Sequence, residues 1–497
     1  MAPASSSGGE LVPKDPTGSL TLSKNHEPFT FDYSTSQPQD TNWIGLYHAS
    51  GGGPVNESYI APPIVWKYAP DAKGSVHLPV DYLEPGEYEA YFLAHGGYKW
   101  LAPPITVTLE APPARLYFPV QQVTLHNARK SERYVAHIGG LLLGRSDAKV
   151  VFEKTGGDRW IRVDSDGTIS GTPSHNAPQR SHVDIRATAD NGASALLKAI
   201  IPVRPPGQAL VEDLRVMTFN MWHGGTQVNN YHEKQLRFVL ESGADIIGLQ
   251  EATSDHAIRL GEALGWHHWQ SSQSVGIISR YPIVEEYGEI NRAGGVRISL
   301  NGNSRRKSEI NFWSTHLGYN PYGPYDFCYD HMSFEQVLER EAQSGRTPQI
   351  TELLGGIQSQ LNNSKNVPVI LVGDFNAPSH LDWTEALREK NCGIADFPWP
   401  TSVLPTKSGF IDSFRVAHPD PAAEAGVTWS PLFPFHNGDS GNPEPQDRID
   451  FIYHTKEKLS VMDSQRLVVG NPKPSPHHKH NKWTSDHAAV LTHYHLK

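Results

Sequence analysis

In the second half of this chain, six strand-like hydrophobic segments each adjoin a polar residue of a type that performs acid–base or metal chemistry. In chain order these residues are Asn220, Glu251, His316, Asp374 with Asn376, Asp450, and Asp486 with His487. Taken one at a time, each residue has a structural explanation: it could close a turn, cap a helix, or be a buried histidine whose hydrogen bonds are satisfied within the fold. Because layered α/β domains build their sites at strand ends, the whole series predicts an α/β domain with one active site.

Together and in this order, these residues resemble the motifs of the endonuclease/exonuclease/phosphatase family. Members of that family include deoxyribonuclease I, abasic-site endonucleases, sphingomyelinases and inositol polyphosphate 5-phosphatases. The resemblance runs from about Leu214 to the end of the chain. It implies a four-layered α-β-β-α sandwich and the hydrolysis of a phosphate ester.

Phosphate ester hydrolysis requires neutralised charge on the transferred group and a positioned water. Carboxylate and amide oxygens are hard ligands of the kind that Mg²⁺ takes. By the resemblance, Glu251 is the principal metal ligand, with Asn220 beside it and Asp486 near the metal and the water. The implied cofactor is Mg²⁺ or Mn²⁺.

The resemblance assigns acid–base roles to the other motif residues. Asp374 would orient or deprotonate the attacking water, and Asn376 would donate amide hydrogens to the phosphoryl oxygens. Asp450 would hold His487 in the protonation state or tautomer that suits a phosphate, as a carboxylate orients a catalytic imidazole. His316 would donate to a phosphoryl or leaving oxygen.

One departure from the family's pattern bears on the substrate. Abasic-site endonucleases have an acidic residue two positions after the motif asparagine, where this chain has Trp222. The region from Leu210 onward also carries more acidic than basic residues, whereas tracking duplex DNA requires clustered basic residues. Duplex DNA is therefore disfavoured, and a phosphorylated small molecule or a lipid headgroup is the expected substrate.

Four residues outside the central motifs are candidates for substrate binding. His223 follows Trp222, Arg448 precedes a strand-like segment, and Tyr322 and Tyr325 lie in a proline-rich aromatic stretch. Aromatic rings beside a catalytic strand end could stack on a base, a sugar or an apolar moiety. A surface loop that packs on itself explains the aromatic stretch equally well, and an ordinary turn explains His223.

These observations predict a metal-dependent phosphoesterase that hydrolyses a phosphodiester or phosphomonoester by in-line attack of an activated water. A nuclease acting on DNA or RNA is the alternative among enzymes. A catalytically retired binding or scaffolding protein is the alternative from another class. The presence of the complete set of motif residues argues against a domain that has lost its catalytic activity.

Two proline clusters divide the 497 residues into three parts. They are Ala111-Pro112-Pro113 and the segment from Pro202 to Gly207, and they predict domains at 1–110, 111–207 and 210–497. Around 42–47 the first part resembles the SKICH domain and the N-terminal sandwich of plant-type purple acid phosphatases. Around 167–173 the second part resembles immunoglobulin- or cadherin-like modules. Both parts are expected to be immunoglobulin-like β-sandwiches.

Composition excludes an integral membrane protein with helical spans, because no apolar stretch approaches the roughly 20 residues that a spanning helix needs. Cys328 and Cys392 are too few for a disulfide framework, and we expect both to be free thiols. Residues 1–15 show no secretory signal pattern, so a cytoplasmic location is expected. Glycosylation sequons at Asn56 and Asn362 would matter only in a secreted protein.

Overall fold

The computed structural model describes residues 17–23, 29–79, 83, 85–109, 115–144, 148–302, 307–436 and 441–497. The chain forms two compact units, Met1–Ala114 and Arg115–Lys497. The expected linker at Ala111-Pro112-Pro113 and the N-terminal residues 1–15 lie outside the described residues. No helix in the described part of the chain has the length and apolar character needed to cross a bilayer.

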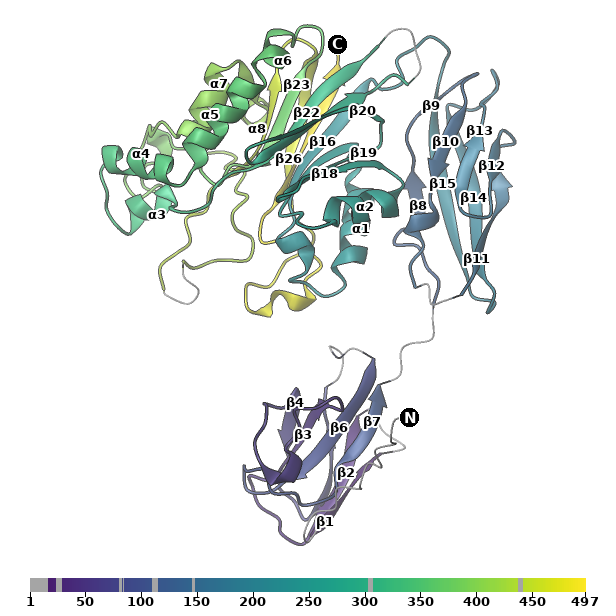
Figure 1. Cartoon of the computed structure of the whole chain (residues 1–497), viewed down its shortest axis with the longest axis vertical. Coiled ribbons are helices and arrows are strands. Elements are labelled where there is room, and N and C mark those ends of the chain that lie inside the picture. The colour runs from purple at the N-terminus through teal and green to yellow at the C-terminus, as the bar shows by residue number, and fades with distance from the viewer. Residues whose placement is uncertain are drawn as a thin grey trace, which may run out of the picture. The chain divides into compact units, whose positions relative to one another are not determined.

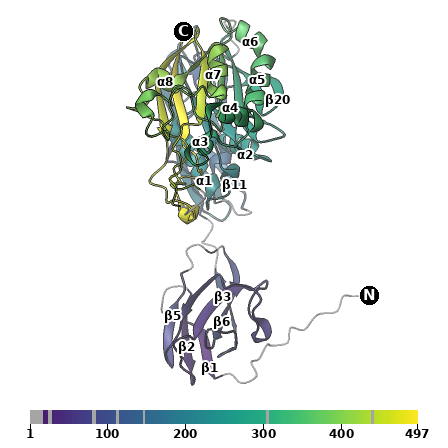
Figure 2. The same ribbon diagram turned by 90° about the vertical axis from the view of Figure 1, so that its left-hand side faces the viewer.

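The first unit contains two antiparallel sheets that share one hydrophobic core (Figure 2). One sheet has the order β1 (Gly18–Leu22), β2 (Thr30–Thr35) and β5 (Lys73–His77), and the other has the order β4 (Val65–Tyr68), β3 (Trp43–His48), β6 (Gly86–Leu93) and β7 (Ile105–Leu109). Alternate residues such as Ile44, Leu46 and Phe92 face this core, as the two-residue period of a strand requires. The resemblance to an immunoglobulin-like or SKICH domain stays a prediction.

The second unit begins with two further sheets, built from residues 122–204. The smaller has the order β10 (Tyr134–His137), β13 (Thr168–Gly171) and β12 (Ile161–Val163). The larger has the order β11 (Val150–Gly157), β14 (Arg180–Ala189), β15 (Ser194–Arg204) and β8 (Gln122–Thr124), with β9 (Ala128–Arg129) also paired to β15. Side chains from both sheets enter the same hydrophobic cluster, so the segment is a small sandwich. Its immunoglobulin-like topology also stays a prediction.

The remainder of the second unit is an α/β domain, which confirms the α/β class predicted for this part of the chain. Its first sheet has the order β18 (His267–Gln270), β19 (Val275–Ser279), β17 (Ile246–Gln250), β16 (Asp213–Asn220), β27 (Ala489–Leu496) and β26 (Leu459–Leu467). Its second sheet has the order β20 (Ile283–Ile290), β21 (Ala293–Ser299), β22 (Glu309–His316), β23 (Val369–Asp374), β25 (Asp450–Thr455) and β24 (Phe410–Asp412).

The two sheets pack face to face, with helices on the outside (Figure 1). Val216, Ile277, Phe312 and Ile452 belong to the apolar layer between the sheets. Helices α1 (Tyr231–Ser242) and α2 (His256–Leu264) cover the outer face of the first sheet, and α5 (Arg346–Gly356) packs on the outer face of the second. The remaining short helices are α3 (Gly323–Cys328), α7 (Pro400–Lys407), α8 (Ser413–Ala417), η2 (Gly139–Leu141), η3 (His223–Gly225), η4 (Glu385–Leu387) and η5 (His477–His480).

The mostly helical spacing of Leu338, Ile350, Leu353, Leu354 and Ile357 predicts an outer-face helix with breaks between Phe334 and Leu361, and the structure shows a series of helices there. The segment forms α4 (Phe334–Gln343), α5, and α6 (Gln358–Asn362). Helix α4 starts at a capping box, in which Ser333 accepts from the backbone of Gln336 and the Gln336 side chain accepts from the backbone of Ser333.

The small sandwich and the α/β domain share one continuous hydrophobic cluster, which joins Leu141 and Leu142 to Leu260 and Leu264 of α2. Polar contacts cross the same junction, including the Tyr117 hydroxyl to Glu233 at 2.8 Å. Residues 115–207 and 210–497 thus belong to one compact unit, although the sequence predicts a linker between them. The reason is that α2 presents apolar side chains both to the first sheet and to the small sandwich, which covers its outer side.

The two cysteines are not free thiols, as the sequence analysis expected. Cys328, at the end of α3, forms a disulfide with Cys392, which lies 64 residues further along the chain. Two isolated cysteines give no sequence signal for pairing, because pairing depends on whether the fold brings their Cα atoms close together.

Candidate active site

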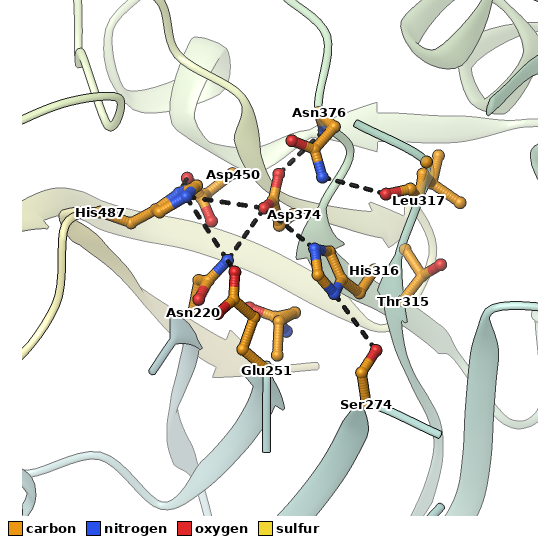
Figure 3. Close-up of polar contacts among 12 residues, drawn as sticks. Asn220, Glu251, Ser274, Thr315, His316, Leu317, Asp374, Asn376, Asp450 and His487 are labelled. Atoms are coloured by element: carbon orange, nitrogen blue, oxygen red, sulfur yellow. Dashed lines mark hydrogen bonds and ion pairs between the residues drawn. The ribbon is translucent and has the colours of Figure 1, made fainter. Parts of the chain in front are cut away.

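The strand register brings the motif residues to one edge of the two sheets. Asn220 ends β16 and pairs with Gln250, the residue before Glu251. In the other sheet His316 pairs with Asp374, and Asp374 pairs with Asp450 on its other side. Because the sheets stack face to face, these strand ends open into the same space (Figure 3). The sequence-based expectation of one site is therefore met in the geometry, while the role of each residue stays a prediction.

Asn220 lies at the centre of the cluster and links the two sheets (Figure 3). Its side-chain nitrogen lies 3.0 Å from Oδ2 of Asp374, 3.3 Å from Oε1 of Glu251 and 3.4 Å from Nε2 of His487. Its side-chain oxygen accepts from the backbone N–H of Trp222 at 2.9 Å, which fixes the orientation of the amide. A buried amide with several partners holds these charged groups in one arrangement.

His487 and Asp450 form a buried pair. Nδ1 of His487 lies 2.9 Å from Oδ2 of Asp450, and Nε2 lies 3.7 Å from Oδ2 of Asp374. Burial alone would lower the pKa of His487, but the carboxylates of Asp450 and Asp374 outweigh it and raise the pKa well above its ordinary value. The Trp429 ring packs on the imidazole with 4.9 Å between ring centroids. The site therefore favours a cationic imidazolium beside the position of an anionic substrate.

Asp374 is buried between the two histidines. Burial raises its pKa, and the nearby His487 opposes this rise. Its Oδ1 accepts from the backbone N–H of Asn376 at 2.8 Å, and its Oδ2 lies 3.6 Å from Nε2 of His316. Nδ1 of His316 is in turn 3.2 Å from the hydroxyl of Ser274. A carboxylate with a raised pKa and ordered neighbours is suited to accept a proton from water.

Asn376 approaches the site in an unusual backbone conformation. Its φ is +50°, in the left-handed region that asparagine tolerates better than most residues. Its side-chain nitrogen donates to the backbone oxygen of Leu317 at 3.0 Å. The second amide hydrogen is available to a ligand, since an asparagine amide has two donors.

Oxygen ligands for a cation gather at the Glu251 end of the cluster. Glu251 is held by the backbone N–H of His223 at 2.7 Å, and the His223 ring nitrogen lies 3.5 Å away. Burial would raise the pKa of Glu251, but His316 and the other neighbouring donors outweigh this effect and lower the pKa, so the group is ionised. Burial raises the pKa of Asp486 to about 7. Its buried Oδ1 has no hydrogen-bond partner within the described part of the chain.

These donors fit a hard divalent cation, because an unpartnered buried carboxylate oxygen beside an ionised glutamate is satisfied when a cation binds. Asp374, Asp450 and His487 are a second possible ligand group, with one donor atom from each lying within 4.8 Å of the others. We favour the Glu251 and Asp486 group, since Nδ1 of His487 is already held by Asp450.

A cavity of about 680 Å³ opens over the cluster. One part is lined by His223 and by six of the motif residues, Glu251, His316, Asp374, Asn376, Asp486 and His487. The aromatic residues Tyr319, Tyr322, Tyr325 and Trp429 line the rest. The aromatic stretch after His316 thus forms a pocket wall, with part of it folded as α3.

Two tyrosine hydroxyls of this wall, those of Tyr322 and Tyr325, are bonded to carboxylates. The Tyr322 hydroxyl donates to Asp447 at 2.9 Å, and the Tyr325 hydroxyl donates to Glu444 at 2.6 Å. Burial raises the pKa of Asp447 to about 6. Only the aromatic rings of Tyr322 and Tyr325 therefore remain to contact a substrate, because both hydroxyls are committed to carboxylates.

Arg448 does not take the substrate-binding position that the sequence analysis expected. Its guanidinium is fully buried, donates to Asp382 and Asp412 at 2.8–3.1 Å, and does not line the cavity. Two carboxylates bind its polar face, as buried arginine requires. Arg448 is therefore a structural residue that fixes the start of β25.

The structure also adds site residues that the sequence analysis did not single out. Trp429 packs on His487, Ser274 contacts His316, and Arg292 lines the cavity. The Ser485 hydroxyl donates to the backbone oxygen of Asn220 at 2.6 Å, which ties the last motif to the first. Ser485 and Ser274 stand beside strand segments, so a search for hydroxyls at strand ends would have found them. Trp429 lies in an irregular loop and has no such signal.

Comparison with known proteins identifies the family. The family model described as "Endonuclease/Exonuclease/phosphatase family" matches residues 217–487, which is more than half of the chain and contains every motif residue above. The chain belongs to the endonuclease/exonuclease/phosphatase family. An uncharacterized Caenorhabditis elegans protein, F14F9.5, is 33% identical over 297 residues, which cover 56% of this chain and 91% of that protein.

Solved structures similar to this family member include one from C. elegans and one from Neisseria meningitidis. C. elegans TDP2 is 14% identical, with a TM-score of 0.37 over 57% of this chain and 75% of that one. The 3'-5' exonuclease NExo from Neisseria meningitidis is 17% identical, with a TM-score of 0.34 over 56% of this chain and 98% of that one. At these identities and scores, neither likeness bears on the substrate.

Proposed function

We propose that this family member is a metal-dependent phosphoesterase that hydrolyses a small-molecule or lipid-headgroup phosphoester by in-line attack of a water. The observation that carries the proposal is the meeting of Asn220, His316 and His487 around one carboxylate oxygen of Asp374, within 3.0–3.7 Å. This geometry supports a base, a neutral donor and a cation acting on one small volume.

Each motif residue has a role that its contacts support. Asp374 orients the attacking water and takes its proton, because its pKa is raised by burial. His487, held cationic by Asp450, and the free amide hydrogen of Asn376 stabilise the phosphoryl oxygens as charge develops on them. His316 donates toward the leaving oxygen.

Glu251 and Asp486, with Asn220 beside them, are the residues that would hold Mg²⁺ or Mn²⁺. When bound there, the cation supplies charge neutralisation for the phosphoryl group. The His223 ring, two-thirds exposed and 3.5 Å from Glu251, flanks the same position and contacts the substrate.

The proposed substrate class rests on the aromatic wall. A group attached to the phosphate would meet the rings of Tyr322 and Tyr325 and the exposed ring of Tyr319 rather than a row of cations. Among the described residues that line the cavity, Arg292 is the single arginine or lysine. Several lysines and arginines are needed where a protein binds the phosphates of a duplex, so this wall suits a compact phosphoester with an apolar or planar moiety.

Tyr325 offers the sharpest test, because its ring and its hydroxyl can be separated by substitution. We compare wild type, Tyr325→Ala and Tyr325→Phe on bis-p-nitrophenyl phosphate, p-nitrophenyl phosphate, sphingomyelin, inositol phosphates and plasmid DNA, with Mg²⁺ and with Mn²⁺. We expect saturable turnover of a small phosphoester, a KM raised about tenfold by Tyr325→Ala and little change with Tyr325→Phe.

Other results would support the alternatives. Efficient nicking of plasmid DNA that falls steeply with salt and is indifferent to Tyr325→Ala would favour a nuclease. Absence of turnover on every substrate with either metal would favour a retired catalytic domain that serves binding or scaffolding.

A further inference from the structure

The first unit has a second apolar face outside its core. In its four-stranded sheet, residues that alternate with the core positions point to the opposite side, and there Trp43, Tyr47 and Tyr91 form a separate aromatic cluster. A sheet that borders the core on one side normally presents polar residues to water on the other. Here the outer face is aromatic instead: the cluster itself is buried, and further rings at its margin are exposed.

Five rings form a strip along this face, Tyr68, Trp66, Trp43, Tyr98 and Tyr59, of which Trp43 is buried and Tyr98 is half-buried. Successive ring centroids along this aromatic strip are 5.0, 6.0, 6.0 and 5.4 Å apart. Trp66 and Tyr68 lie on β4, the edge strand of the sheet. Tyr68 is 54%, Trp66 46% and Tyr59 58% exposed. Large rings exposed side by side are typical of binding surfaces rather than of random surface positions.

The strip is set in place by the residues around it. The Trp43 ring lies over Gly45, where an added Cβ would stand 2.5 Å from the ring, so that position needs glycine. The Trp43 indole N–H donates to the backbone oxygen of Gly97 at 3.1 Å. The strip therefore has a fixed base at Trp43, with Trp66 and Tyr98 packed against it on either side.

The polarity of the strip indicates its partner. The hydroxyls of Tyr59 and Tyr68 and the indole N–H of Trp66 make no hydrogen bond to the described residues, so they are available as donors and acceptors. A ligand for this surface needs an apolar face to lie on the rings and hydroxyl groups at its edges to meet these donors. A purely aliphatic surface would leave the three polar groups without partners.

The charges around the strip exclude an acidic partner. Glu57 accepts from the backbone N–H of Trp100 at 3.1 Å, and Glu89 accepts from the Tyr91 hydroxyl at 2.5 Å. Lys67 of β4 alternates to the opposite face of the sheet. These carboxylates give no attraction for phospholipid headgroups or nucleic acid.

We infer that the aromatic strip is a binding site for a neutral carbohydrate, whose sugar rings present C–H faces to the aromatic rings and hydroxyls to their polar edges. Spacings of 5.0–6.0 Å between ring centroids are on the scale of one sugar ring. Neighbouring rings from Tyr68 to Tyr98 meet at 76–81°, so a linear oligosaccharide would meet ring faces and ring edges in alternation. The strip belongs to the first unit and the cavity to the second, and the inference does not depend on the proposed phosphoesterase activity.

The test uses the full chain and calorimetric titration with cellohexaose, xylohexaose and chitohexaose. We expect saturable binding of at least one of these oligosaccharides, weakened roughly tenfold or more by Trp66→Ala and by Tyr68→Ala. Leu22→Ala is the matched control, because Leu22 is an exposed apolar residue on the other sheet of the same unit. Turnover of a small phosphoester should be the same in all four proteins.

Three results would overturn the inference. Absence of binding to all three oligosaccharides at millimolar concentration would exclude a site for linear neutral glycans. Dimerisation of the wild type in analytical ultracentrifugation that Trp66→Ala abolishes would show that a second copy of the chain covers the strip. Binding to neutral phosphatidylcholine vesicles that Trp66→Ala abolishes would show a lipid surface instead.

Discussion

Nδ1 of His487 and Oδ2 of Asp450 lie 2.9 Å apart as a buried pair, although 37 residues separate them in the chain. The other ring nitrogen of His487 faces Asp374 and Asn220. Asp450 therefore controls both the orientation and the charge of the imidazole. A residue that acts only through another gives a specific signature in mutant kinetics, because groups that work as a unit lose activity non-additively.

We expect His487→Ala to reduce kcat by roughly 10²–10⁴ and Asp450→Ala to cause a loss of similar order. The double variant should be scarcely slower than His487→Ala alone, as measured by steady-state kinetics on a small phosphoester. Fully multiplicative losses would show that the two residues act independently.

Glu251→Gln keeps the size of the side chain and removes its charge. We expect turnover to fall roughly 10²-fold or more, with little change in melting temperature, because the variant loses the main cation ligand. Calorimetric titration with Mg²⁺ should show a matching loss of affinity. Glu286→Gln, at an exposed glutamate on β20, is the control and should resemble wild type. Equal metal affinity in the Glu251 variant would contradict the ligand assignment.

Two truncations distinguish the units of the fold. Removing Met1–Ala114 should leave a folded protein with nearly the wild-type melting temperature, because that segment is a separate compact unit. Removing Met1–Gln208 should destabilise the remainder, since it exposes the face of α2 that packs on Leu141 and Leu142. Each large apolar side chain exposed costs about 2 kcal/mol. Circular dichroism melts of both fragments provide the comparison, and equal stability would show that the small sandwich is dispensable.

Asp447 gives the stability of the second unit a defined pH dependence. Burial raises its pKa from 3.8 to about 6, so the folded state binds this proton more tightly than the unfolded state does. The contribution to stability is complete below about pH 4 and is lost as the pH rises through about 6. The expected change is about 2–3 kcal/mol. In urea unfolding, the free energy of unfolding of wild type should fall by this amount, relative to that of Asp447→Asn, between about pH 4 and about pH 7. If the difference in free energy of unfolding between wild type and Asp447→Asn does not change with pH, a group other than Asp447 is responsible for the titration.

The disulfide between Cys328 and Cys392 should stabilise the pocket wall. It closes a loop of 64 residues, for which loop entropy gives about 4 kcal/mol. The double variant Cys328→Ala/Cys392→Ala should be less stable by about this amount and should not respond to dithiothreitol, whereas dithiothreitol should shift wild type toward the variant. Identical melts of wild type and variant under oxidising conditions would indicate that the bond does not form.

Much of the catalytic domain could be predicted from the sequence. Alternating and continuous apolar segments predict strands such as β16, β17 and β23, because side-chain periodicity is a local property of the backbone. Asn220, Glu251 and Asp374 could be selected because each directly follows such a segment or ends it. Their convergence follows from one general rule, that strand ends in a layered sheet lie at the same edge.

The sequence by itself therefore determined the α/β class of the C-terminal region and the chemical types at its site, since both depend on short-range patterns. Only the tertiary structure decided which distant residues meet. It paired Cys328 with Cys392, directed the Tyr325 hydroxyl to Glu444 and enclosed Arg448 between two aspartates. It also packed the small sandwich onto α2, where the sequence suggested a linker. Such contacts depend on where the folded backbone places each side chain, and residues far apart in sequence carry no local record of their partners.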